Sequence, residues 1–260
     1  MINREIIVEL IEQFAVASPL NVVDGLRGMR IYDSPMVGFA SADDPLFSQF
    51  RDPGVIGPHH LPPGEWLAEA ATVISYFLPF SARVREANRG PGLPAVEWLY
   101  GRIEGEQFNN ALRRHLCDEI SKAGGQAVAP AIDPRFEIIN ERANWSERHA
   151  AFAAGLGTFC LSKSMITSKG SAGRFGSVVT TLQYEPTRRP YTGVYEYCTR
   201  CGACIDRCPV GAISTEGKEH RPCSHYINAE IKEHCAPRVG CGKCQTGVPC
   251  EGSIPRAAER

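Results

Sequence analysis

The crowding of cysteines near the carboxyl end limits the fold of this chain more than any other feature. Nine of the 11 cysteines lie between positions 198 and 250, and only Cys117 and Cys160 precede that block. An odd total packed into one end of an apparently cytosolic chain argues against a disulfide framework. A segment this short and poor in apolar stretches builds little core, so we expect metal-bound thiolates to organise it.

The first four cysteines of the block have the spacing C-x2-C-x2-C-x3-C followed by proline, over residues 198–209. Three thiolates at these short spacings wrap one corner of an iron–sulfur cubane, and the fourth ligates the other cluster in two-cluster ferredoxins. Structural zinc usually takes two separated pairs of ligands, which fits such a compact run poorly. The run therefore predicts two [4Fe–4S] clusters rather than zinc.

A second set of cysteines must complete the two cluster sites. Cys241 and Cys244 form another C-x2-C pair, with Cys223 upstream and Cys250 downstream. By the ferredoxin pattern we expect two sets of four ligands: Cys198, Cys201, Cys204 and Cys250 for one cluster, and Cys208, Cys223, Cys241 and Cys244 for the other. Cys235 is an alternative to Cys223 in the second set.

Helices and strands are predicted to alternate before the cysteine block. Apolar residues at helical spacing and an N-cap serine predict three helices, at residues 2–16, 97–123 and 146–154. Apolar, β-branched runs predict three strands, at residues 71–78, 126–132 and 174–181. Residues 18–64 are rich in Gly, Pro and Asp and are expected to form loops with short strands.

The chain is expected to hold two domains and to belong to the α+β class. The alternation of elements favours an α/β domain over residues 1–185. Residues 184–195 carry two prolines, two arginines and a glycine and form the expected linker. The iron–sulfur domain is then expected over residues 186–260.

Charge and hydropathy argue against several functions. The net charge is −1, whereas nucleic-acid-binding proteins usually carry a basic excess, so no nucleic-acid partner is expected. No apolar run approaches the ~20 residues that span a membrane. Charged residues interrupt the amino-terminal apolar segment, unlike the core of a secretory signal, so we expect a cytoplasmic protein. No G-x-G-x-x-G loop follows a strand, and no nicotinamide or flavin site is expected.

Residues 145–181, followed by the cysteine run, resemble the segment that precedes the clusters in epoxyqueuosine reductases and, more distantly, in reductive dehalogenases. Four features carry the resemblance: the pair Glu147-Arg148, AGLG at 154–157, MIT at 165–167, and the strand that ends at Thr181. The resemblance implies a base-off cobalamin between a nitroreductase-like, B12-processing domain and the ferredoxin-like domain. It also implies that the clusters deliver single electrons to cobalt.

The resemblance further implies which residues contact the cofactor. The loop over residues 155–164 would border the corrin, since glycines let backbone approach a flat ring closely. Guanidinium groups could anchor amide or phosphate groups of the cofactor, with structural ion pairs as the alternative role. The expected contacts are Arg148, Gly155, Leu156, Gly157, Thr158, Phe159, Cys160, Ser164 and Arg174.

This chain departs from the epoxyqueuosine reductase pattern at several positions. Cys160-Leu161-Ser162 stand where that family usually has Gly-Lys-Asn. The family's catalytic aspartate aligns with Glu141, while Asp133 is the nearest aspartate upstream; either could donate a proton, and either could be a solvated loop carboxylate. The family's carboxyl-terminal helical repeats are absent, which together with the charge argues against a tRNA substrate.

Three functions are compatible with these features. The first is a cobalamin-dependent reductase that takes electrons from a ferredoxin or flavodoxin and reduces a small molecule. The second is a protein that reduces or carries cobalamin for a partner enzyme. The third is an electron-transfer protein whose α/β domain docks a partner. All three share the ferredoxin-like domain.

Overall fold

A four-stranded sheet forms the centre of the computed structural model, which describes residues 2–256. Its strands are β3 (Met36–Ser41), β4 (Thr72–Pro79), β10 (Gly173–Thr180) and β5 (Ala127–Val128), in the order β3-β4-β10-β5. Each neighbouring pair is antiparallel. The amino-terminal part thus mixes helices and strands as expected, around an antiparallel rather than a parallel sheet.

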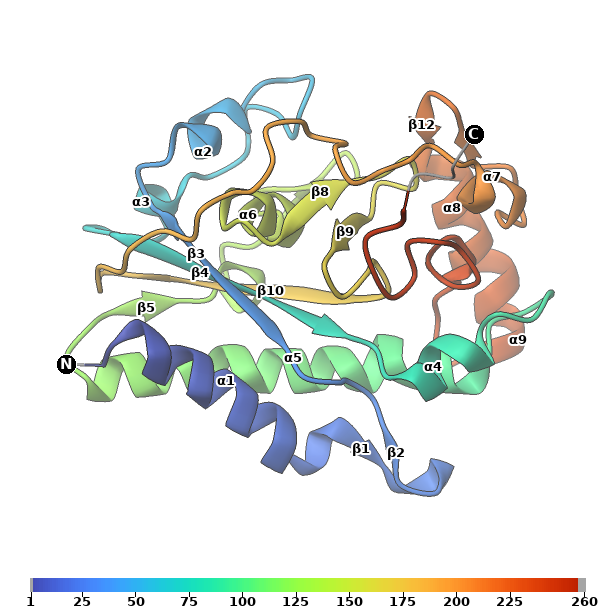
Figure 1. Cartoon of the computed structure of the whole chain (residues 1–260), viewed down its shortest axis with the longest axis horizontal. Helices are drawn as coiled ribbons and strands as arrows, with labels where there is room; N and C mark the ends of the chain where they lie inside the picture. Colours follow the sequence, from blue (N-terminus) through green and yellow to red (C-terminus); the bar gives the residue numbers. More distant parts are fainter. Residues whose placement is uncertain (1, 257–260) are drawn as a thin grey trace.

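Helices cover both faces of this sheet (Figure 1). Helices α1 (Arg4–Ala17) and α5 (Val96–Lys122) lie on one face, and α6 (Glu147–Ala153) lies on the other. The whole of β4 is buried because its side chains alternate between the two layers. Ile74 packs in the cluster with α1 and α5, whereas Val73 packs in the cluster with α6.

Shorter elements surround the sheet. Ahead of α5 they are β1 (Val22–Val23), β2 (Met29–Arg30), α2 (Pro45–Gln49), α3 (Pro63–Trp66) and α4 (Ala82–Ala87). After α5 they are the hairpins of β6 (Ile138–Ile139) with β7 (Arg142–Ala143) and of β8 (Gly157–Phe159) with β9 (Met165–Thr167).

The three predicted helices and two of the three predicted strands are confirmed. The strand expected over residues 126–132 is only two residues long, because Pro130 lacks the N–H that a longer ladder needs and starts a 3-10 turn. Residues 18–64, expected to be mostly loops, contribute β3 to the main sheet.

The cysteine-rich part contains only short elements. They are α7 (Ala203–Asp206), β11 (Ile213–Ser214), β12 (Gly217–Lys218), α8 (His220–Tyr226) and α9 (Lys232–Cys235). Its main apolar cluster holds Tyr226 and Ile231 against Leu99 of α5. Residues 184–190 run without helix or strand, as expected of the linker, but Thr187 exchanges hydrogen bonds with the backbone of Phe39 on β3. No helix among the described residues is both long and apolar enough to cross a membrane.

Candidate functional site

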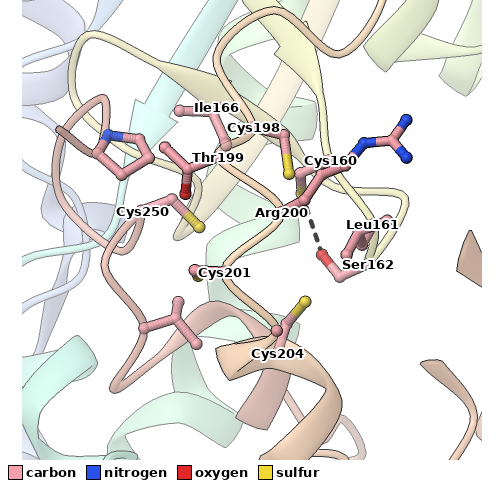
Figure 2. A pocket seen from close by; sticks show the side chains of 13 residues that line it. Cys160, Leu161, Ser162, Ile166, Cys198, Thr199, Arg200, Cys201, Cys204 and Cys250 are labelled. Atoms are coloured by element: carbon pink, nitrogen blue, oxygen red, sulfur yellow. Dashed lines mark hydrogen bonds between the residues drawn. The ribbon is translucent and has the colours of Figure 1, made fainter. Parts of the chain in front are cut away.

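A small cavity at the start of the cysteine-rich part is surrounded by thiols (Figure 2). Four of its cysteines come from the cysteine-rich part, and Cys160 comes from the turn between β8 and β9. The lining cysteines are Cys198, Cys201, Cys204, Cys250 and Cys160. Leu161, Ile166 and Val248 make much of the remaining wall apolar.

Left-handed backbone lets the chain turn around this cavity. Arg200 and Gly202 both have positive φ, of 53° and 81°, and Gly202 caps the start of α7. Burial raises the pKa of Cys204 to about 11 and that of Cys250 to about 12, and the neighbouring thiols add to both shifts. Metal ions must displace these protons when the thiols become ligands.

A second, larger cavity lies beside the first part of β10. Its volume is about 840 Å³, towards the upper end of the range for small-molecule and cofactor sites. Strand β5 pairs only with Val179 and Thr180, so the beginning of β10 is an open edge of the sheet. Helices α5 and α6 line the cavity on the sheet side, and the cysteine-rich loops line it on the other.

The remaining four cysteines of the expected ligand sets line the large cavity: Cys208, Cys223, Cys241 and Cys244. The two cavities therefore divide the eight cysteines into the same two groups that the spacing predicts. Cys235 lines neither cavity and packs beside the apolar cluster of Tyr226 and Ile231. Among residues 2–256, no three His, Cys, Asp or Glu side chains are close enough together to hold a single metal ion.

A buried ion network holds the sheet side of the large cavity. The guanidinium of Arg113, 2% exposed, lies 2.8 Å from Glu106 and 3.0 Å from Glu147. Arg113 and Asn109 also donate hydrogen bonds to the carbonyl of Phe175, which the open edge of β10 leaves without a strand partner. The network joins α5, α6 and β10.

The two carboxyl groups of this network differ in acidity. Burial raises the pKa of Glu147, although Arg113 and the Ser177 hydroxyl, which donates to the carboxylate, act against that shift. Burial also raises the pKa of Glu106, but Arg174 and Arg113 outweigh it and hold that pKa below its usual range. Two carboxyl groups with opposite pKa shifts in one cavity are typical of acid–base sites.

The two acids expected from the sequence do not line the large cavity. Glu141 lies at the exposed tip of the β6–β7 hairpin, 3.4 Å from His220. Asp133 is paired with Arg135 at 2.8 Å. Two other carboxylates, Glu106 and Glu147, line the cavity, and the sequence did not predict them as acids of the site. The available signals were the Glu147-Arg148 pair and the placement of Glu106 and Arg113 two turns apart on one helical face.

The expected cofactor contacts fall into three groups. Arg148, Ser164 and Arg174 line the large cavity, and Cys160 lines the small one. The other five line neither: Gly155, Leu156, Gly157, Thr158 and Phe159. Gly157 has a packing role, since a Cβ there would lie 2.1 Å from the carbonyl oxygen of Ile166 across the β8–β9 hairpin.

Comparison with known proteins identifies an iron–sulfur domain. The family model described as a 4Fe-4S binding domain matches residues 191–214, which contain the C-x2-C-x2-C-x3-C run. This match supports the predicted iron–sulfur chemistry. It contains Cys198, Cys201 and Cys204 of the first expected ligand set and Cys208 of the second.

The curated relatives are reductases. The chain is 23% identical to the epoxyqueuosine reductase of Bacillus subtilis over 215 residues, which are 78% of this chain and 52% of that protein. It is 40% identical to the tetrachloroethene reductive dehalogenase of Desulfitobacterium hafniense over 111 residues, or 40% of this chain and 20% of that one. The chain thus spans about half the length of the epoxyqueuosine reductases that it matches.

Solved structures of the same two kinds of protein share the fold. A catabolic reductive dehalogenase covers 85% of this chain and 30% of its own length, with a TM-score of 0.60 and 14% identity. An epoxyqueuosine reductase solved with a tRNA stem loop covers 96% of this chain and 67% of its own, with a TM-score of 0.55 and 18% identity. The chain thus contains a 4Fe-4S binding domain and is similar in sequence and in fold to epoxyqueuosine reductases and reductive dehalogenases.

Proposed function

We propose that this protein is a reductase in which two [4Fe–4S] clusters pass electrons to a cobalamin bound in the large cavity. The observation that carries the proposal is the composition of that cavity. One wall holds the four thiols of the second ligand set, and the opposite wall holds guanidinium, amide and carboxyl groups of α5, α6 and β10. A redox group and a binding surface therefore share one space.

The two cluster sites would have different tasks. Cys201, in the small cavity, is exposed to solvent, so this cluster is the better point of entry for electrons from a ferredoxin or flavodoxin. Cys244 lines the large cavity, and burial raises its thiol pKa to about 12. The cluster at that site would be the one nearest the cofactor.

The large cavity suits the chemistry of cobalamin. Corrin side chains carry many carboxamides, and the nucleotide tail carries a phosphate. Gln107, Asn110 and Arg148 offer amide and guanidinium donors on the cavity wall. When bound, cobalamin would supply a metal that accepts single electrons and reduces an organic group.

Glu147 is positioned to hold a proton in the same cavity. Its raised pKa keeps the carboxyl group protonated at higher pH than an exposed glutamate, as a general acid requires. Ser177 and Arg113 fix its two oxygen atoms. We assign to Glu147 the role expected earlier for Glu141 or Asp133.

Metal and corrin analysis of anaerobically purified protein tests the proposal. We expect iron and sulfide in equal amounts, near eight of each per chain for two cubanes. Added hydroxocobalamin should be retained on gel filtration and reduced by the reduced protein, seen in its visible spectrum. Clusters without any retained corrin would overturn the cobalamin part, and zinc in place of iron would overturn the whole.

Two observations support a modified tRNA as the second candidate substrate. The curated relatives include epoxyqueuosine reductases, and one such enzyme is solved with a tRNA stem loop. Binding of a synthetic stem loop, measured by fluorescence anisotropy at two salt concentrations, separates this candidate from a small-molecule substrate. Saturable binding that depends on the modified base would favour tRNA.

A further inference from the structure

The large cavity contains more positive than negative side chains. Its guanidinium groups belong to Arg102, Arg113, Arg148 and Arg174, and its carboxylates belong to Glu106 and Glu147. With both acids ionised the excess is four minus two, or two positive charges, and with Glu147 protonated it is four minus one, or three, before Lys218 at the cysteine-rich wall is added. Arg113 is buried, Arg102 and Arg174 are partly buried, and Arg148 is exposed to solvent. Like charges gathered in one cavity repel one another unless a partner compensates them.

Arg113 compensates much of the negative charge of the two carboxylates. It contacts both carboxylates, and its guanidinium is 2% exposed. Glu147 uses its remaining oxygen to accept a hydrogen bond from Ser177. Arg113 and Glu147 are thus partners within the fold and leave little charge for a ligand.

Arg174 shares its carboxylate with Arg113. Its guanidinium lies 3.4 Å from Glu106 and donates a 2.6 Å hydrogen bond to the backbone carbonyl of Arg102. One carboxylate between two guanidinium groups compensates only part of their charge.

Arg102 and Arg148 have no carboxylate partner among residues 2–256. In that part of the chain, the Arg102 guanidinium makes no hydrogen bond, and Arg148 donates one to the carbonyl of Lys163. The loop at Gly240 packs against the Arg102 side chain so closely that a Cβ would lie 2.7 Å from its Cγ. This packing holds the Arg102 stem in place with its donors uncommitted.

The three guanidinium groups are close enough to repel one another. Burial and the charge of Arg174 lower the pKa of Arg102 to about 10. The charge of Arg148, which is itself exposed to solvent, adds to the lowering of the Arg102 pKa. An anion at this position would relieve the repulsion and supply the missing hydrogen-bond acceptors.

We propose that Arg102, Arg148 and Arg174 form a subsite for a phosphate or carboxylate group of the ligand that enters the large cavity. This inference rests on the proposed function, because it concerns the same cavity. The anionic group belongs either to the phosphate of the cofactor or to an acidic substrate. Arginine suits both, since its planar fork binds such groups through two parallel hydrogen bonds.

Anion binding to the cluster-loaded, cobalamin-free protein tests the subsite. Inorganic phosphate and benzoate are titrated by calorimetry into the wild type, Arg102→Gln and Arg148→Gln. The control is Arg114→Gln, which alters an exposed arginine on α5, the helix that carries Arg102. Each cavity substitution should weaken binding about ten- to hundred-fold, as loss of a charge-assisted hydrogen bond does. The control should bind as the wild type does. Equal iron contents establish that the variants fold.

Repeating the titration after loading with hydroxocobalamin identifies the source of the anion. If cobalamin blocks both probes, the subsite holds the cofactor's phosphate; if benzoate still binds, the subsite holds an acidic substrate. Both results support the inference. Binding that is absent, or that is equal in the wild type and both cavity variants, overturns it. Failure to retain cobalamin, with phosphate binding intact, overturns the proposed function alone.

Discussion

The two thiol-lined cavities are built in different ways. The small one is formed mostly by one continuous run, Cys198 to Cys204, with apolar neighbours and one exposed thiol. The four thiols of the large cavity come from separate segments, and α5, α6 and β10 form its opposite wall. Under the proposed function, this difference suits the small site to receive electrons from a partner and the large site to deliver them to a bound ligand.

Removing one ligand from each set is the strongest test of this division. Cys204→Ala and Cys244→Ala should each lose about half of the iron and sulfide, because each thiol serves a different cubane. Once reduced and then freed of dithionite, only Cys244→Ala should fail to reduce added hydroxocobalamin, while Cys204→Ala should lose its own reduction by a protein donor. Iron analysis and stopped-flow absorbance make these measurements.

Cys117→Ala is the matched control for both ligand variants. Cys117 lies on α5, lines neither cavity, and packs against the main core, so its loss should leave the iron content unchanged. If Cys204→Ala and Cys244→Ala gave identical electron-transfer defects, the two sites would not have separate tasks.

A second pair of variants tests which upstream cysteine completes the large site. Cys223→Ser should lose about half of the iron, because the Cys223 side chain lines the cavity with Cys241 and Cys244. Cys235→Ser should keep all of it, because Cys235, on α9, lines neither cavity. The reverse pattern of iron loss would assign Cys235 as the ligand.

The iron–sulfur run of residues 198–209 could be recognised because its information is local. The spacing of residues 198–209 follows from the geometry of one cubane and needs no knowledge of the fold. The choice between Cys223 and Cys235 depends on how α8 and α9 pack, which the spacing does not determine. The helices and long strands were foreseen for the same local reason, through their apolar periodicity.

The ion network of the large cavity could not be foreseen in the same way. Glu106 and Glu147 are 41 positions apart in the chain, and only the packing of α5 and α6 around the open edge of β10 brings them to Arg113. The alignment singled out Glu141, which lies in the turn between β6 and β7, so its position depends on that hairpin. Gly157, read as a cofactor contact, is explained by the close backbone of its own hairpin.

The sheet wall of the large cavity should depend on Arg113. Arg113→Met leaves Glu147 buried without its partner, and removing one member of a buried ion pair typically costs about 3–5 kcal/mol of folding free energy. Guanidinium unfolding followed by far-ultraviolet circular dichroism measures the loss. Exposed Arg114→Met should change the stability by less than about 0.5 kcal/mol. An equal effect of the two substitutions would mean that the network does not support the cavity.

Glu147 gives the smallest effect, a dependence of stability on pH. A carboxyl group whose pKa is raised in the folded protein binds its proton more tightly there than in the unfolded chain. Its contribution to stability is therefore complete below the usual glutamate pKa and is lost as pH rises through the higher pKa of the folded state. Glu106, whose pKa is lowered, acts in the opposite sense at lower pH. Unfolding midpoints of the wild type and Glu147→Gln, measured across this range, should converge at low pH and separate as pH rises, because glutamine resembles the protonated form only. Curves that stay parallel would show that the pKa of Glu147 is not raised in the folded protein, which would remove it as the proton donor of the large cavity.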